Sequence, residues 1–390
     1  MALAFTSPTA GPPVWPTSVA VLRESLLSWR DRLLASPRFQ RWAAGTPLTR
    51  GIARRRARQL FDLCAGFVYS QVLAACVELR LFDLLKDGSR TADALAERLS
   101  LPQTSVERLM AAAVSLRLVE RRSNGHFGLG QLGAALLGNP GVLAMIEHHR
   151  LLYSDLRDPV SLLRGAADET DLARYWPYAQ SAAPSACDTE RFAPYTALMA
   201  ASQQLIADDV LSAYPVAWHR CLLDVGGGDG TFLSAVASDA PRLDLQLFDL
   251  PAVARRARER QADGTLPRRV KVIEGDFLSD ALPDGADLVT LVRVVHDHDD
   301  DAALRILRAI RDRLPRDGVL LIAEPMAGTA GAETVGDVYF NFYLLAMSRG
   351  RARTPEELTR LLRAAGFGRV DFPRMRRPLQ TRLAVAHPRR

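Results

Sequence analysis

Residues 222–231 combine glycines and carboxylates in a pattern typical of a small-molecule binding turn. They read Leu-Leu-Asp-Val-Gly-Gly-Gly-Asp-Gly-Thr, an apolar strand that ends in a glycine turn flanked by Asp224 and Asp229. Glycine adopts positive φ angles and lets the backbone approach a ligand closely, and nucleotide-type cofactors bind over such turns at the carboxyl ends of parallel strands. Adjacent glycines also weaken helices and strands without adding packing, so a turn that binds nothing explains the pattern poorly.

The acidic character of this turn decides between cofactors. A dinucleotide fingerprint needs glycines at its first, third and sixth positions, but the sixth residue counted from Gly226 is Thr231. The two carboxylates would also repel a phosphate group, which such turns bind through N–H groups and the positive end of a helix. S-adenosyl-L-methionine has no phosphate and carries a sulfonium and an ammonium group. The turn therefore predicts this cofactor, held by Asp224, Gly226 and Gly228.

Acidic residues also end the next two predicted strands. Asp249, followed by Leu250, lies 23 residues after Gly226, and an acid at this place accepts hydrogen bonds from ribose hydroxyls. Asp276 and Phe277 follow the third strand, where the carboxylate would bind an adenine amino group and the ring would cover the base. We therefore expect these four residues to contact the cofactor.

The fourth predicted strand leads into a histidine among acidic residues, in the run Leu-Val-Arg-Val-Val-His-Asp-His-Asp-Asp at 291–300. His296 is the candidate general base, because a neighbouring carboxylate raises the basicity of imidazole and fixes its tautomer. Asp297 is adjacent in the chain. Glu324 ends the next strand, where it either orients His296 or serves as a buried structural acid. The sequence thus predicts His296, Asp297 and Glu324 as the catalytic residues, with Asp299 as the N-cap of the following helix.

The composition indicates a globular protein of two or three domains. The chain has 390 residues, of which 48% are hydrophobic, enough for sizeable cores. No run approaches the roughly 18 apolar residues of a membrane span, and the N-terminus lacks a basic region leading into an apolar one, so we expect a cytoplasmic protein. The four cysteines have no C-x-x-C spacing and no histidine partner, which predicts neither disulfides nor a metal site: Cys64, Cys76, Cys187 and Cys221.

The positive charge of the chain is concentrated in an N-terminal arm. The net charge is +6, yet residues 1–60 alone hold ten arginines and two acids. A helix with one apolar face is predicted in this arm from Val19, Leu22, Leu26, Trp29 and Leu33. This helix either packs on its own domain or on a dimer partner, or it lies on the anionic inner surface of a membrane; both interpretations remain open.

Residues 58–135 are predicted to form a winged helix. Its second helix offers one arginine, Arg108, offset by Glu107, so we expect no contact with nucleic acid and a surface suited to protein packing. A ligand-sensing regulator that binds DNA through this fold is the rival function. The predicted elements are helices near 60–81, 91–99 and 103–116 and strands at 118–122 and 127–129, joined by Asn124-Gly125 in a type I′ turn.

Strands and helices alternate from residue 219 onwards, which predicts an α/β fold with a doubly wound sheet. The helical segment before it, 140–215, carries Trp176, Tyr195 and Met199, which would line an apolar substrate pocket or simply pack in a core. The expected strands are 221–225, the residues up to 248, 270–274, 287–292, 318–323, 370–375 and 383–386.

Together these segments closely resemble the S-adenosylmethionine-dependent O-methyltransferases of the plant caffeic acid type and their bacterial relatives. The resemblance implies a Rossmann-like class I methyltransferase sheet, a mainly helical winged-helix dimerisation domain at the N-terminus, and a homodimer. It also implies a cofactor contact at Arg293 and the role of base for His296. The segments that carry it are 223–230, 248–251, 274–277, 293–297, 323–324 and 350–354.

Two positions depart from the pattern of this family. Family members usually carry glutamate beside the catalytic histidine in the segment Gly-x-Glu-Arg-Thr, but this chain has Ala352. They commonly carry tryptophan after His-Asp, and here the residue is His298. The base would therefore be supported by Asp297 and Glu324 only.

Within the bacterial branch, the basic arm and residues 337–343 resemble the hydroxycarotenoid O-methyltransferases of purple photosynthetic bacteria. This resemblance implies an apolar acceptor with a tertiary hydroxyl, a pocket that includes Asn341 and Phe342, and contact of the arm with a membrane. Alternative acceptors are phenolic or polyketide metabolites, and an enzyme that hydroxylates or decarboxylates with the same cofactor is a further rival. The expected domains are the arm at 1–55, the dimerisation and lid domain at 56–190 and the methyltransferase domain at 191–390.

Overall fold

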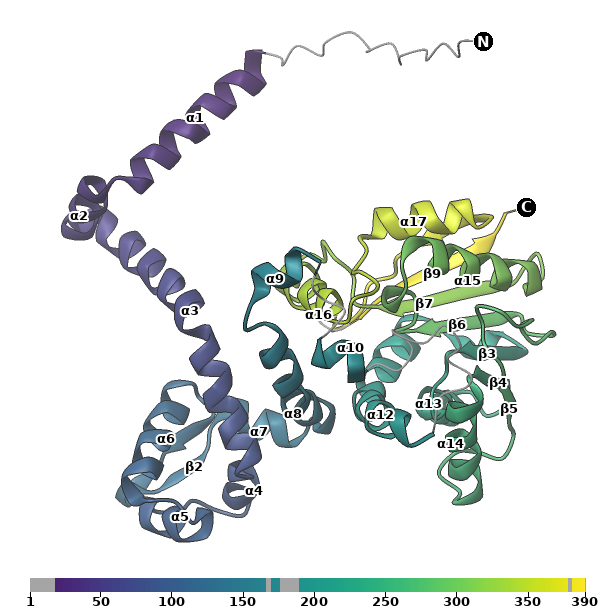
Figure 1. The fold of residues 1–390 in the computed structure, drawn as a ribbon, viewed down its shortest axis with the longest axis horizontal. Coiled ribbons are helices and arrows are strands. Elements are labelled where there is room, and N and C mark those ends of the chain that lie inside the picture. The colour runs from purple at the N-terminus through teal and green to yellow at the C-terminus, as the bar shows by residue number, and fades with distance from the viewer. Residues whose placement is uncertain (1–17, 166–169, 176–188, 378–380, 390) are drawn as a thin grey trace, which may run out of the picture. The chain divides into compact units, whose positions relative to one another are not determined.

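The computed structural model describes residues 18–165, 170–175, 189–377 and 381–389 (Figure 1). The chain forms two compact units, Met1–Val72 and Leu73–Arg390, which we describe separately. The expected domain boundaries at 55/56 and 190/191 both fall inside helices, α3 (Pro47–Glu78) and α12 (Thr189–Ala213).

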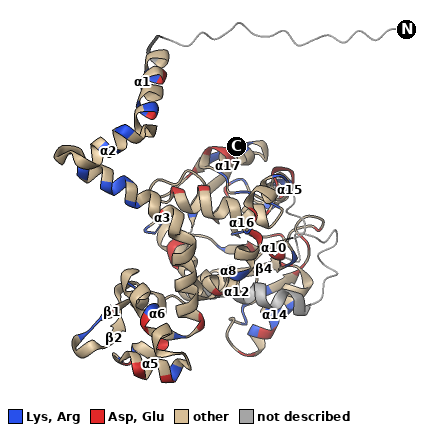
Figure 2. Cartoon of the chain, turned by 60° about the vertical axis from the view of Figure 1, so that its left-hand side comes forward, with Lys and Arg blue, Asp and Glu red and all other residues tan. Residues whose placement is uncertain are grey.

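The N-terminal unit is helical. It contains α1 (Ser18–Ala35), α2 (Pro37–Gly45) and most of α3. Ser36 begins α2 by accepting a hydrogen bond from the backbone N–H of Phe39, and Pro37 occupies the first helical position, where its missing N–H costs nothing. Figure 2 shows the arginines of the arm along these helices.

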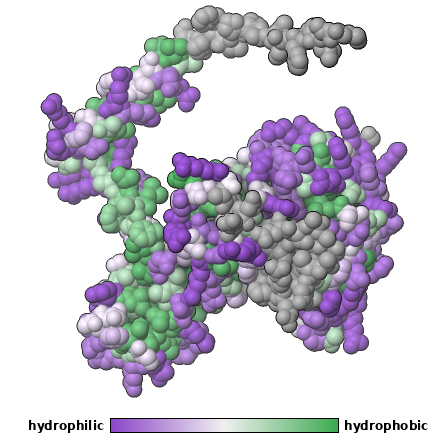
Figure 3. Space-filling model, viewed as in Figure 1, coloured by the Kyte–Doolittle hydropathy of each residue, from purple (hydrophilic) through white to green (hydrophobic). Residues whose placement is uncertain are grey.

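Helix α3 corrects the expectation that no segment could span a membrane. Among the described residues it is the one helix that is long and apolar enough to do so, by length and composition only. Buried core helices of soluble proteins pass the same test, but only 11% of the most apolar window of α3 is buried. Figure 3 shows the hydrophobic surface over this helix. Its exposed large apolar side chains are Leu48, Ile52, Leu60, Phe61, Leu63, Phe67 and Val68.

The second unit begins with the expected winged helix. Asn124 and Gly125 have φ angles of 56° and 73°, as a type I′ hairpin turn requires, and the strands pair Val119 with Leu129. Ser100, in the left-handed conformation, ends the helix that begins at Ala92. The elements are α4 (Leu81–Lys86), α5 (Ala92–Leu99), α6 (Gln103–Ser115), β1 (Val119–Arg121), β2 (Phe127–Leu129) and α7 (Gln131–Leu137).

A seven-stranded sheet forms the centre of the second unit, in the order β5-β4-β3-β6-β7-β9-β8. The strands from β3 to β7 are parallel, and β9 lies antiparallel between β7 and β8. The expected strand 370–375 is wrong in position, because Pro373 cannot donate a ladder hydrogen bond. The strands are β3 (Cys221–Val225), β4 (Asp244–Asp249), β5 (Val270–Glu274), β6 (Leu288–Val292), β7 (Val319–Glu324), β8 (Phe367–Asp371) and β9 (Arg382–Pro388).

Helices cover both faces of this sheet, as the doubly wound prediction requires (Figure 1). On one face α12, α13 (Thr231–Asp239) and α14 (Pro251–Ala262) bury apolar residues such as Phe232 and Leu233. On the other, α15 (Asp300–Arg313) and α17 (Pro355–Ala364) bury Ile306 and Leu362. A third cluster is formed by α8 (Pro140–Asp155), α9 (Pro159–Leu163), α10 (Asp171–Tyr175), the π-helix η6 (Thr334–Phe340) and α16 (Asn341–Ala346).

Candidate active site

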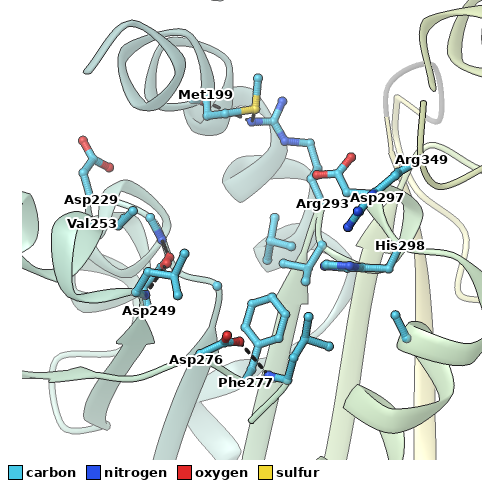
Figure 4. A pocket seen from close by; sticks show the side chains of 18 of the residues that line it. Met199, Asp229, Asp249, Val253, Asp276, Phe277, Arg293, Asp297, His298 and Arg349 are labelled. Carbon is cyan, nitrogen blue, oxygen red and sulfur yellow. Dashed lines mark hydrogen bonds between the residues drawn. The ribbon is translucent and has the colours of Figure 1, made fainter. Parts of the chain in front are cut away.

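The strand order reverses beside β3, where β4 lies on one side and β6 on the other, and a cavity opens there beyond the carboxyl ends of the strands (Figure 4). Ligands of doubly wound sheets bind at this place. Its volume is about 420 Å³, within the usual range for small-molecule sites. The expected cofactor residues that line it are Gly226, Gly228, Asp249, Leu250, Asp276, Phe277 and Arg293.

The glycine turn has the backbone conformation that its sequence predicts. Gly226, Gly228 and Gly230 have φ angles of 70°, 63° and 82°, which L-residues with side chains rarely adopt. A Cβ atom at Gly226 would lie 2.8 Å from Val294 Cγ2. Glycine at this position therefore leaves the cavity open between β3 and β6.

Asp249 closes the turn from the neighbouring strand. Its Oδ2 accepts a hydrogen bond from the backbone N–H of Gly228 at 2.8 Å, and its Oδ1 accepts one from Leu250 at 2.7 Å. The side chain is buried, and this burial raises the pKa of Asp249 to about 7. The carboxyl group thus fixes the glycine turn and adds acidic character to the cavity wall.

Asp224, expected to contact the cofactor, does not line the cavity. It lies beneath the glycine turn and is 1% exposed, with Oδ1 accepting a 2.6 Å hydrogen bond from Thr290 Oγ1. A Cβ atom at Gly227 would lie 2.8 Å from Asp224 Oδ2, so the turn itself covers the carboxyl group. Burial, together with the charge of nearby Asp249, raises the pKa of Asp224 to about 7.

Asp276, Phe277 and His298 line the opposite wall. Asp276 Oδ1 accepts a hydrogen bond from the backbone N–H of Leu278, and the rings of Phe277 and His298 meet edge to face at 5.6 Å. His298 points into the cavity (Figure 4), and burial lowers its pKa to about 4, so its imidazole is neutral at pH 7. The residue that replaces the expected tryptophan therefore still forms part of the wall.

Arg293 connects the end of β6 to α12. It has a positive φ angle of 58°, and its guanidinium donates to Ser202 Oγ at 2.8 Å and to the backbone carbonyl of Met199 at 3.2 Å. Met199, expected in the acceptor pocket, lines the cofactor cavity beside this arginine. Asp229, which flanks the glycine turn, also lines the cavity, and further lining residues that were not predicted include Gln203, Arg305, Met347 and Arg349.

His296 lies behind the cavity wall, with both predicted carboxylates beside it. Its Nε2 is 3.1 Å from Asp297 Oδ1, and its Nδ1 is 3.8 Å from Glu324 Oε2. Asp297 also lines the cavity, whereas His296 and Glu324 are 6% and 3% exposed. The structure therefore brings the three predicted catalytic residues together, at one edge of the cofactor cavity.

The burial of this cluster sets its protonation. Burial lowers the pKa of His296 to about 3, assisted by the positive charges of Arg293 and Arg353. Burial also raises the pKa of Glu324 to about 7 and raises that of Asp297 well above its ordinary value. His296 is consequently neutral at pH 7 and has a lone pair for a proton.

The structure describes the side chains of three of the five expected acceptor residues, Met199, Asn341 and Phe342. Trp176 lies outside the described residues, and so does the side chain of Tyr195. Asn341 donates a hydrogen bond to the carbonyl of Asp337, and neither it nor Phe342 lines the cofactor cavity.

The preceding π-helix instead presents Tyr339 and Phe340 to the apolar cluster around Met199 and Met347. The ring of Phe340 meets that of His296 edge to face at 6.2 Å. Ala352, where the family usually carries glutamate, is buried in the same cluster. The surroundings of His296 on this side are thus apolar.

Comparisons with known proteins agree with this geometry. Residues 153–368 match the sequence model of the O-methyltransferase domain, and residues 61–139 match that of the O-methyltransferase dimerisation domain. The demethylspheroidene O-methyltransferase of Cereibacter sphaeroides is 42% identical over 358 residues, 92% of this chain and 94% of that protein. The enzyme of the same name from Rhodobacter capsulatus is 42% identical over 94% of this chain and 91% of its own length.

Solved structures share the fold. Human N-acetylserotonin methyltransferase, crystallised with S-adenosylmethionine, superposes with a TM-score of 0.73 at 24% identity, covering 86% of this chain and 98% of its own. CalO1, a methyltransferase of calicheamicin biosynthesis crystallised with S-adenosylhomocysteine, gives a TM-score of 0.71 at 28% identity over the same shares. The class I methyltransferase fold expected from the sequence is confirmed.

Replacing Asp224 by asparagine is expected to stabilise the cofactor-free protein above pH 7. Because the folded state raises the pKa of Asp224 to about 7, it retains a proton that the unfolded chain has already released, and stability falls as the pH rises from about 4 to about 7. Asparagine still accepts the hydrogen bond from Thr290 and carries no charge. Calorimetry should show a melting temperature roughly a few degrees above wild type at pH 8 and no gain near pH 4.

A matched control is Asp244→Asn, which removes an exposed carboxylate from the neighbouring strand β4. We expect no pH-dependent gain in its melting temperature. A D224N protein that melts below wild type at pH 8 would show that the buried carboxylate stabilises the fold, contrary to this account.

Proposed function

Because the chain belongs to the S-adenosyl-L-methionine-dependent O-methyltransferases, we propose that it methylates a hydroxyl of an apolar acceptor, the tertiary hydroxyl of a carotenoid. The observation that carries the proposal is the neutral, buried His296 held between Asp297 and Glu324 at the edge of an acid-lined cavity. The two relatives with 42% identity act on a carotenoid according to their names.

The described residues fit this cofactor. Asp249 and Asp276 present carboxyl groups to the cavity, Phe277 presents a ring, and the glycine turn leaves space that a Cβ atom at Gly226 would fill. When bound, S-adenosyl-L-methionine supplies an electrophilic methyl group on a cationic sulfur. The acidic wall favours this positive charge, and residues at the ends of β4 and β5 would hold the adenosine part.

His296 would act as the general base of the transfer. When S-adenosyl-L-methionine is bound it would supply the methyl group, and the imidazole of His296 would accept the proton that the acceptor hydroxyl gives up. A pKa of about 3 makes His296 a weak base, so we expect proton transfer to accompany bond formation rather than to precede it. Asp297 and Glu324 then stabilise the imidazolium.

Positioning supplies the larger part of the rate. A sulfonium methyl group is already reactive, and holding it against an oxygen in the correct geometry is worth several kcal/mol. Phe340, Met199 and Met347 surround the acceptor side with apolar groups. Burying an apolar acceptor there removes apolar surface from water, which is favourable, whereas a polar acceptor would lose hydrogen bonds to water.

The dimerisation domain provides an interface for the exposed part of α3. Leu63 and Phe67 are 82% and 71% exposed and lie one helical turn apart. Both lie inside the matched dimerisation domain. We propose that a second copy of the chain covers this apolar surface, because large exposed apolar patches on soluble proteins mark interfaces.

The arm that precedes this domain suits an anionic membrane surface. Leu22, Leu26 and Trp29 follow one another along α1 and are each more than half exposed. Arginines surround them, and the arginine run 54–56 lies in the exposed N-terminal half of α3. Apolar side chains inserted among head groups, with arginines beside the lipid phosphates, would hold the enzyme on the cytoplasmic surface of a membrane where a carotenoid dissolves.

The first test measures methyl transfer directly. Purified protein with S-adenosyl-L-methionine and a carotenoid bearing a tertiary hydroxyl should give the monomethyl ether and an equimolar amount of S-adenosylhomocysteine, by mass spectrometry. His296→Ala should lower kcat roughly 10²-fold without changing the affinity for S-adenosylhomocysteine. A phenolic acceptor methylated in preference would overturn the carotenoid assignment, and an unchanged kcat in H296A would reject the base.

A second test concerns the dimer. The double substitution L63E/F67E places two charges in the proposed interface, so light scattering should report a monomer where the wild type is a dimer. Trp218→Glu is the control, because Trp218 is 81% exposed outside the dimerisation domain. A double variant that remains dimeric would place the interface elsewhere.

A third test concerns the arm. Deleting residues 1–45, which end with α2, should abolish binding to vesicles of phosphatidylglycerol and phosphatidylcholine in a flotation assay. The triple variant R54Q/R55Q/R56Q should weaken it roughly tenfold or more, since each arginine near an anionic surface contributes about 1 kcal/mol. Pure phosphatidylcholine vesicles are the control. Equal binding of the deleted and full-length proteins would end the membrane proposal.

A further inference from the structure

The residues around His296 form a single 3₁₀ turn, η5 (Val295–Asp297), whose backbone groups are held from outside. The backbone N–H of Val295 donates to Glu324 Oε1 at 2.7 Å, and the carbonyl of His296 accepts from the backbone N–H of Arg351 at 2.9 Å. So short a turn has little stability of its own. The orientation of His296 therefore depends on the groups that hold this turn.

Arg353 holds the turn on both sides of the histidine. It is 3% exposed, and its Nη1 donates to the carbonyl of Val295 at 2.8 Å while its Nη2 donates to the carbonyl of His298 at 2.7 Å. The remaining Nε donates to Asp300 Oδ1 at 2.9 Å. A buried guanidinium is costly unless its donors are used, and here they bracket the His296-Asp297 pair.

We propose that Arg353 is the positioning residue of this active site: it fixes the turn that carries His296 where Ala352 supplies no carboxylate to hold the imidazole. The planar fork of an arginine suits this function, because it binds two carbonyl oxygens in a fixed relative position. This inference rests on the proposed function only in that His296 is the base.

The charge of Arg353 has a second consequence for His296. The charged groups that face the imidazole are the carboxyls of Asp297 and Glu324 and the cations of Arg293 and Arg353, with neutral His298 nearby. Burial is the largest cause of the low pKa of His296, and the two arginines lower it further. Removing the cation of Arg353 should therefore raise the pKa of His296, while a lysine at 353 should preserve it.

Two substitutions separate the geometry from the charge. Arg353→Lys keeps the charge but cannot bridge both carbonyls, so kcat should fall roughly tenfold with the pH profile unchanged. Arg353→Gln loses both, so kcat should fall further and the acid limb of the pH profile should move to higher pH. For both variants the affinity for S-adenosylhomocysteine should stay within about threefold of wild type, because Arg353 does not line the cofactor cavity.

The matched control is Arg269→Gln. Arg269 also bridges backbone carbonyls, those of Ala237, Ala240 and Leu243, but it lies at the opposite end of the sheet from His296. The R269Q substitution should lower the melting temperature without changing kcat or the pH profile. If R269Q lowers kcat as much as R353K, the effect of Arg353 is merely structural and the inference fails.

A measurement without acceptor keeps the inference distinct from the proposed function. The pKa of His296 is followed by NMR of histidine-labelled protein, with H296A to assign the signal. It should rise in R353Q and stay unchanged in R353K and R269Q. An unchanged pKa in R353Q, or a folded R353K with wild-type kcat, overturns the positioning function. If R353Q does not fold, R353K decides by kcat. A wild type that methylates no acceptor contradicts the proposed function alone.

Discussion

Carboxyl groups buried at the carboxyl ends of parallel strands are the constraint on which the rest of the structure depends. Asp224, Asp249 and Glu324 are all buried, on three strands of one sheet. Burying an ionised carboxylate costs several kcal/mol unless hydrogen bonds or a cation compensate. Hydrogen bonds to these carboxylates offset part of the desolvation free energy. The remainder favours the protonated form, so the pKa values of these acids are raised.

The same hydrogen bonds give the site its shape. Asp249 holds the backbone of the glycine turn, and Glu324 holds the first residue of the turn that carries His296. Each acid therefore does two things: it fixes a loop that has few contacts of its own, and it adds negative charge next to a cavity that suits a cationic ligand. Loop geometry and electrostatics are consequently linked, so that a substitution at either acid changes both.

Sequence reasoning succeeded where a residue type is tied to a position at a strand end. Gly226 needs a positive φ angle, Asp249 must end its strand, and His296 must follow β6, and the structure places all three at one edge of the sheet. The spacing of residues does not predict how deeply a side chain is buried. Nothing in the spacing shows that the glycine turn covers Asp224, or that Arg353 is buried against two carbonyls.

Helical phase is a second property that the sequence does not show. The expected acceptor residues Asn341 and Phe342 follow from the resemblance of their segment, which does not show which side of a helix faces inward. Similarly, the arginines and the apolar residues of Pro47–Glu78 suggested separate segments, but nothing between them breaks a helix, and α3 runs through without interruption.

The number of residues in the π-helix Thr334–Phe340 determines which of its side chains lies beside the imidazole of His296. A π turn holds about one residue more than an α turn, and such segments are often found at functional sites. Removing one residue from this segment would let it wind as an ordinary α-helix: the helix that follows would keep roughly its orientation, but a different side chain of the segment would lie beside the imidazole. In evolution, the wall beside the imidazole could thus be exchanged by one codon gained or lost, with every aromatic residue of the segment kept.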